Sequence, residues 1–174
     1  MRQIGLPPAL VHPAEIDESV LKGELPAAHA RRLASAKLAA VAPDHSDAYV
    51  LAADTVVACG RRILPKAEDA ATARACLELL SGRRHRVLGA IEVRAPDGIH
   101  RRRLVTTSVL VKRLSSGEIE HYLASGEWRG KAGGYAIQGL AASFIPAITG
   151  SYSNVVGLPL ADTWALLRGL GYRP

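Results

Sequence analysis

The strongest pattern of apolar and polar positions predicts a helix that starts after Asp69. Apolar residues recur at the i, i+3, i+4, i+7 spacing of a one-sided helix, at Ala73, Cys76, Leu77 and Leu80. Asp69 suits the N-cap, and Gly82 lies just past the last apolar position, where helices commonly end. Three more helices are predicted: an alanine-rich one from Pro26 to Ala42, one that begins at the capping-box pair Ser115 and Glu118 and stops near Gly126, and one over about 160–168.

Short apolar runs bounded by polar or turn residues predict the strands. The run 49–53 leads into Asp54 and Thr55, continues with 56–59, and turns at Gly60 into a partner at 61–64. Two longer strands, 84–94 and 100–112, are joined by a Pro-Asp-Gly turn and should pair antiparallel. A last strand is expected at 143–148. This order indicates an α/β (α+β) fold, a mixed twisted sheet flanked by helices, rather than a repeated βαβ array.

The length of 174 residues, of which 48% are hydrophobic, is enough to bury one core. There is no internal repeat, low-complexity tract or long linker, so one compact unit over 1–174 is expected. No apolar run is long enough for a membrane span, and the first residues do not resemble a signal peptide, which favours a cytoplasmic enzyme or binding protein. Cys59 and Cys76 lack metal-site spacing and are expected to be reduced core residues.

The formal net charge of +6 and the clustering of arginines favour a polyanionic partner, either nucleic acid or the phosphates of a nucleotide. The chain has only one Phe and two Trp, so it offers little aromatic surface on which bases could stack. We therefore favour solvated strand ends over an RNA-binding surface.

A glycine-rich stretch, 130–139, has four glycines around Lys131 and Gln138, and a second glycine-containing segment follows at 150–160. Such a composition makes a poor helix and a poor strand, because glycine loses the most conformational freedom on folding. It does allow backbone N–H groups to approach an anion or a flat base closely. We interpret the stretch as the floor of a binding site.

Asp54 interrupts an apolar run, where an unpaired carboxylate would cost several kcal/mol. It is either a turn or capping residue at a strand end, or a general base or metal ligand, and we favour the second interpretation. Thr55 can hydrogen-bond a ligand or a neighbouring backbone group.

Three lysines are candidates for phosphate binding. Lys37 would share a helical face with apolar residues, Lys66 follows a strand end, and Lys131 lies in the glycine-rich stretch. The alternative for Lys37 is that it simply reaches solvent past its apolar neighbours. The acidic cluster of Glu15, Asp17 and Glu18 could be a solvated turn, or could join Asp54 in holding Mg²⁺ with the help of phosphate oxygens.

Several ordered motifs together resemble the Maf family of nucleoside triphosphate pyrophosphatases. They are Ile16-Asp17-Glu18, the helix segment from Arg32 to Lys37, Ala53-Asp54-Thr55-Val56-Val57, Ile63-Leu64-Pro65-Lys66, Leu79-Leu80-Ser81-Gly82 with His85, Ser125-Gly126-Glu127, and the two glycine-rich segments. The similarity extends from about Ile4 to Leu167. Each motif is moderately specific, and their shared order and spacing is the stronger argument.

The resemblance implies a fold like that of Maf and inosine triphosphate pyrophosphatase, with two lobes around a central cleft. It also implies hydrolysis of a nucleoside triphosphate between its α and β phosphates with Mg²⁺ or Mn²⁺. Asp54 matches the catalytic aspartate of the family, Glu18 a residue that assists the metal, and Lys37 and Lys66 residues that neutralise phosphate charge. Thr55 and Gln138 match positions that mark the subfamily acting on dTTP, UTP and possibly modified pyrimidine nucleotides. Members of the family also tend to form homodimers.

The chain departs from the family pattern in two places. The family begins with a strand and a Ser-Pro-Arg-Arg loop that would grip the triphosphate, whereas Met1 to Gly5 of this chain align with the end of the helix after that loop. A start codon assigned too late is our favoured explanation, and a truncated paralogue is the alternative. In addition, Pro65-Lys66-Ala67 replaces the usual Gly-Lys-Pro.

Two other functions are compatible with the sequence. One is a non-catalytic regulator of cell division and septum formation that binds nucleotide or nucleic acid. The other is a pyrophosphatase directed at purine nucleotides. Gln138 favours the pyrimidine enzyme, because its amide has both the donor and the acceptor needed to read the imide edge of uracil or thymine.

Overall fold

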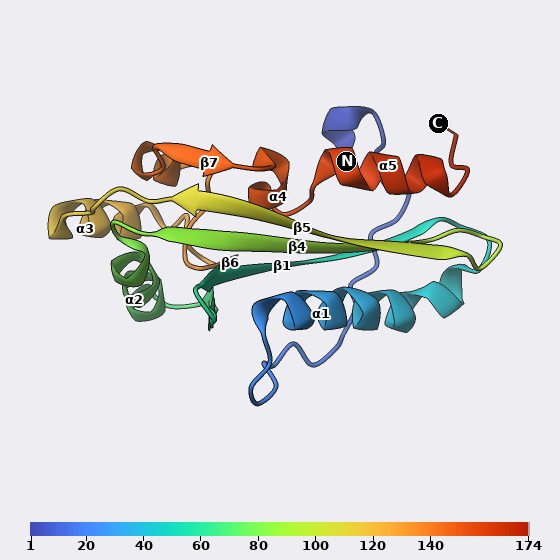
Figure 1. Ribbon diagram of the computed structural model, residues 1–174, viewed down its shortest axis with the longest axis horizontal. Helices are drawn as coiled ribbons and strands as arrows, with labels where there is room; N and C mark the ends of the chain where they lie inside the picture. Colours follow the sequence, from blue (N-terminus) through green and yellow to red (C-terminus); the bar gives the residue numbers. More distant parts are fainter. Residues whose placement is uncertain (174) are drawn as a thin grey trace.

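The computed structural model describes residues 1–173, and its centre is a twisted antiparallel sheet with the strand order β2-β1-β4-β5-β7 (Figure 1). The five strands are β1 (Val50–Cys59), β2 (Arg62–Leu64), β4 (Arg84–Arg94), β5 (His100–Leu110) and β7 (Ala147–Thr149). A separate pair is formed by β3 (Lys66–Ala67) and β6 (Lys131–Ala132). The predicted fold class, a sheet flanked by helices, is confirmed, and every pairing within the described residues is antiparallel.

Helices cover both faces of the sheet (Figure 1). The helix α1 (Pro26–Val41) lies along one face, and α4 (Tyr152–Val156), α5 (Leu160–Gly169) and the 3-10 turn η1 (Arg2–Ile4) lie on the other. The helices α2 (Ala70–Leu80) and α3 (Ser116–Ser125) pack together at one end. Two further 3-10 turns are η2 (Ala42–His45) and η3 (Leu140–Phe144). No helix within residues 1–173 has the length and hydrophobicity to cross a membrane.

The pleat of β1 decides which side chains face which layer. Alternate residues of a strand point to opposite faces, and Val56 and Ala58 pack with Ala30 and Ala34 of α1. Asp54 shares this parity and points toward α1, whereas Thr55 points to the other face and bonds with the end of α4. Since β2 pairs only with residues 57–59, β4 is the only strand beside residues 50–56 of β1 among residues 1–173.

Most predicted elements are confirmed. The helices α1, α2, α3 and α5 start and end within one residue of the predicted bounds, and Asp69 accepts a hydrogen bond from the Thr72 backbone as an N-cap should. Ser115 and Glu118 form the predicted capping box. The long strands β4 and β5 pair through their predicted turn.

Two expectations are wrong. The alternative interpretation of Asp54 as a turn or capping residue at a strand end is wrong, because β1 continues without interruption from Val50 to Cys59 and the carboxylate is ion-paired on the α1 side. The predicted strand 143–148 shrinks to β7, since η3 extends through Phe144 and β7 begins only at Ala147. The short elements β3, β6 and α4 carry too few residues to show a periodic signal and were not anticipated.

Both cysteines are free thiols, as expected, and Cys76 is buried while Cys59 is partly exposed. Burial raises the pKa of the Cys76 thiol.

Candidate active site

A cavity of about 280 Å³ lies along the open edge of β1. Its walls come from α1, β1, β3, the glycine-rich stretch and the end of α4. The lining residues are Lys37, Ala53, Asp54, Thr55, Val57, Lys66, Gly130, Lys131, Ala132, Tyr135, Ala136, Gln138, Val155, Val156 and Gly157. The cavity therefore receives side chains from both faces of one strand, with Asp54 on the α1 side and Thr55 on the other.

The glycine-rich stretch forms one wall of this cavity, as the sequence predicts. Its backbone is tied to β3, because the N–H of Gly130 donates to Ala67 and the N–H of Gly133 donates to Pro65, both at 2.9 Å. Gly133 has a φ of 70°, and a Cβ there would approach Val57 Cγ1 to 2.8 Å. A side chain at this position would push the stretch away from β1, so glycine is required for the closure of the wall.

Four charged side chains form a continuous chain of ion pairs at the edge of the cavity. Lys66 Nζ lies 2.5 Å from Glu18 Oε2, and Lys37 Nζ lies 2.6 Å from Glu18 Oε1 and 2.7 Å from Asp54 Oδ1. Four separate parts of the chain meet here: the segment before α1, α1 itself, β1 and β3. Lys37 thus does not simply reach solvent past its apolar neighbours.

The ion pairs keep their members charged. Hydrogen bonds from Lys37 and Lys66 hold the pKa of Glu18 at about 2, well below its usual value. Burial alone would lower the pKa of Lys37, but its bonds to Asp54 and Glu18 outweigh burial and raise it. Asp54 is only 8% exposed, so its carboxylate depends on Lys37 for compensation of its charge.

All six predicted site residues lie in or beside the cavity. Five of them line it, and Glu18 touches two of these through its ion pairs. Thr55 Oγ1 donates to the carbonyl of Gly157 at 3.1 Å, while the Gln138 side chain is exposed at the wall. Lys131, the third candidate lysine, lines the same cavity.

The glycine-rich stretch is also held from behind by residues to which sequence reasoning gave no role. His85 Nε2 lies 2.7 Å from the Tyr135 hydroxyl, and the N–H of Ala136 donates to the Tyr122 hydroxyl at 3.0 Å. Burial lowers the pKa of His85 to about 4, so this imidazole is neutral at pH 7. His85 appeared only as part of a family motif, because an isolated histidine carries no signal of its partner 50 residues away.

Glu127 is the second such residue, and it holds the backbone next to Gln138. Its Oε2 accepts a hydrogen bond from the N–H of Leu140 at 2.7 Å, at the start of η3. A Cβ at Gly139 would lie 2.0 Å from the same oxygen. The Glu127 carboxylate therefore fills the space that a side chain at position 139 would need. The glutamate and the glycine together fix the turn that presents Gln138.

The side chains present fit a divalent cation whose remaining ligands come from phosphate oxygens. No group of three or more His, Cys, Asp or Glu side chains suited to a metal occurs in the described part of the chain. Glu18 and Asp54 each place a carboxylate oxygen within 2.7 Å of the same ammonium nitrogen, so the two acids converge on one point. Mg²⁺ is commonly held by one or two carboxylates, with phosphate oxygens and waters as its other ligands.

Comparison with known proteins adds an independent finding. Residues 1–170 match the family described as Maf-like protein. A dTTP/UTP pyrophosphatase of Paramagnetospirillum magneticum is 68% identical over 174 residues, which is 100% of this chain and 92% of that protein. Proteins of the same description from Rhodospirillum rubrum and Caulobacter vibrioides are 61% and 57% identical over all of this chain and over 83% and 90% of their own lengths.

Proposed function

The chain belongs to the Maf-like protein family, and on this premise we propose that it is a nucleoside triphosphate pyrophosphatase acting on dTTP and UTP. The products would be the nucleoside monophosphate and pyrophosphate. The observation that carries the proposal is the chain of ion pairs from Lys66 to Asp54 at a cavity that also holds Gln138. Charge for the phosphates and an amide for the base are thereby combined in one site.

Asp54 is proposed as the general base. Its carboxylate lines the cavity, and Lys37 holds Oδ1, so the orientation of the carboxylate is defined before substrate enters. Asp54 would accept a proton from the water that attacks the α-phosphorus. The bond from that phosphorus to the oxygen bridging to the β-phosphorus then breaks, and pyrophosphate leaves.

The lysines are proposed to receive the phosphate charge. Lys37, Lys66 and Lys131 line one cavity and act there as point charges for phosphate oxygens. Glu18 and Asp54 are the residues that would hold a Mg²⁺ or Mn²⁺ ion. When bound, such an ion neutralises the negative charge that develops on the phosphate oxygens.

Base selection is assigned to the other wall. Gln138 is exposed at the cavity and carries both a donor and an acceptor, which complements the imide edge of uracil or thymine. Thr55 anchors the end of α4 through Gly157, which keeps that wall in place.

The test is release of pyrophosphate from UTP, dTTP, ITP and GTP with Mg²⁺ or Mn²⁺. We expect activity with UTP and dTTP, and a loss of about 100-fold or more in kcat for Asp54→Asn, because general-base catalysis typically contributes that much. Asp47→Asn is the matched control, since Asp47 is an exposed aspartate outside the cavity.

Equal activity of Asp54→Asn and the wild type would refute the catalytic assignment. Preference for ITP or GTP would contradict the role of Gln138 and favour the purine enzyme. Nucleotide binding without hydrolysis in every variant would favour the non-catalytic regulator.

A further inference from the structure

The segment that delivers Glu18 to the cavity has little regular structure of its own. Residues 6–25 run between η1 and α1 without a helix or strand. A turn closes this segment just before α1, where the N–H of Glu24 donates to Leu21 at 2.9 Å. Something outside the segment must therefore fix the position of Glu18, because a free loop of this length would sample many conformations.

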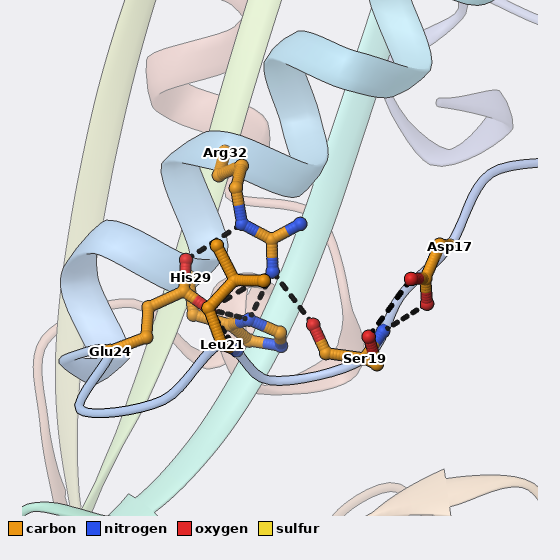
Figure 2. Close-up of polar contacts among 6 residues, drawn as sticks. All are labelled: Asp17, Ser19, Leu21, Glu24, His29 and Arg32. Carbon is orange, nitrogen blue, oxygen red and sulfur yellow. Dashed lines mark hydrogen bonds and ion pairs between the residues drawn. The ribbon is translucent and has the colours of Figure 1, made fainter.

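Glu24, at the end of this segment, forms an ion pair with Arg32 of α1 (Figure 2). Glu24 Oε1 lies 2.7 Å from Arg32 Nε, and Oε2 lies 2.9 Å from Arg32 Nη2, so the pair is bidentate. The Glu24 side chain is only 7% exposed, and its Oε2 also bonds with His29 Nδ1 at 2.8 Å. The Arg32 guanidinium outweighs burial and holds the pKa of Glu24 at about 2.

The same guanidinium reaches the residue next to Glu18. Arg32 Nη2 donates to the carbonyl of Ser19 at 2.8 Å, and Figure 2 shows the guanidinium between Glu24 and Ser19. On the other side of Glu18, Asp17 accepts hydrogen bonds from the N–H and hydroxyl of Ser19 at 2.8 and 3.0 Å. The backbone that carries Glu18 is thus fastened to α1 by one arginine.

The helix α1 therefore holds Glu18 twice. Lys37 binds the carboxylate itself, and Arg32 binds the backbone one residue further along. In the proposed reaction the lysines acquire phosphate partners that compete with Glu18 for their charge. The bond from Arg32 to a backbone carbonyl is not exposed to this competition, because it uses neither the carboxylate nor a lysine.

We infer that Arg32, held in place by Glu24, is a positioning residue. It keeps the Glu18 carboxylate at the cation side of the cavity when Lys37 and Lys66 bind phosphate. The inference rests on the proposed function for its catalytic consequence. The attachment of the backbone beside Glu18 to α1 does not depend on the proposed function. A lysine cannot replace Arg32, since the three bonds to Glu24 and Ser19 require a planar fork.

The first test needs no substrate. Amide hydrogen exchange of the free protein should be faster over residues 17–24 in Arg32→Lys than in wild type, by about tenfold if the loss is close to 1.4 kcal/mol. Arg31→Lys is the matched control, because Arg31 is the preceding, exposed arginine of the same helix. Exchange in Arg31→Lys should equal that of the wild type.

The second test separates positioning from a general loss of stability. The Mn²⁺ concentration needed for half-maximal pyrophosphate release from UTP should rise about tenfold in Arg32→Lys, the usual effect of losing a group that orients a metal ligand. The kcat at saturating Mn²⁺ should change less than twofold. Glu24→Gln keeps an acceptor for Arg32 but loses the charge. Its exchange rate and its Mn²⁺ requirement should therefore lie between those of Arg32→Lys and Arg31→Lys.

The outcomes distinguish the two proposals. Faster exchange in Arg32→Lys, with no hydrolysis by any form of the protein, would support the attachment of the Glu18 backbone by Arg32 and refute the proposed function. Exchange and Mn²⁺ dependence equal to those of Arg31→Lys would overturn the inference. If Arg32→Lys does not fold, Glu24→Gln decides by the same two measurements, and wild-type behaviour in both would likewise overturn it.

Discussion

At the scale of single residues, the cavity depends on two neighbours that leave β1 in opposite directions. Asp54 meets Lys37 on the α1 side, and Thr55 meets Gly157 on the other side. This arrangement is possible because β2 leaves residues 50–56 of β1 without a strand on that edge, within the described residues 1–173. Asp54, the proposed general base, and Thr55, which holds the end of α4, can therefore line one cavity although they are adjacent in sequence.

Gly139 offers a prediction at the same scale. Gly139→Ala would place a Cβ 2.0 Å from Glu127 Oε2, so the carboxylate or the turn must move. We expect a loss of about 1–3 kcal/mol in the free energy of unfolding, the usual range for overpacking. We also expect a higher KM for UTP, because the turn presents Gln138.

Urea unfolding and steady-state kinetics measure both effects. Gly117→Ala is the control, since Gly117 lies in α3 with open space around its Cβ position. That variant should be neutral or slightly more stable. Wild-type stability and KM in Gly139→Ala would show that the 2.0 Å approach does not matter.

At the scale of elements, the sequence predicts those that carry a repeating pattern or a cap. Apolar spacing and Asp69 predict α2, and Ser115 and Glu118 predict α3. The sequence does not predict the position of Asp54 in the middle of β1, because the charge of Asp54 is compensated there by the distant residue Lys37. Family motifs name the six site residues and also contain Arg32 and Glu127, but they assign no role to these two or to Glu24. Arg32 and Glu127 bind backbone groups of distant segments, and the sequence carries no signal of those partners.

The cap of α3 can be tested directly. Ser115 accepts a hydrogen bond from the N–H of Glu118 at 3.3 Å, and Glu118 Oε2 accepts one from the N–H of Ser115 at 2.9 Å. Ser115→Ala should lower the free energy of unfolding by about 1 kcal/mol. Ser116→Ala, one residue inside the helix, should have little effect because alanine has the higher helix propensity. Equal unfolding midpoints for the two variants would contradict the assigned cap.

At the scale of the whole molecule, stability should fall in two stages as the pH decreases. The folded pKa of His85 is about 4, below its ordinary value of 6.5, so the unfolded chain binds more protons in this interval. Stability is therefore lost as the pH falls from 6.5 toward 4, by about 3 kcal/mol for a residue only 2% exposed. Below pH 4.5 a second stage begins, because Glu18 and Glu24 keep folded pKa values of about 2 and their ion pairs persist until they are protonated.

Urea unfolding at a series of pH values checks both stages. In His85→Phe the decline between pH 6.5 and 4 should disappear, whatever its stability at pH 7. The decline below pH 4.5 should remain in this variant. A flat profile from pH 7 to 4.5 in the wild-type protein would be inconsistent with a neutral, buried His85.

A homodimer stays a prediction, to be checked by sedimentation.

The complementary fit of Gly139 and Glu127 also constrains how this part of the protein can evolve. A side chain at 139 collides with the carboxylate at 127, so replacing the glycine while the glutamate remains forces the carboxylate or the turn to move. Loss of Glu127 first would release the Leu140 amide and loosen the turn, yet it would open the space that a larger residue needs. The two positions are therefore coupled, and a side chain at 139 should cost less stability once Glu127 has been replaced by a smaller residue.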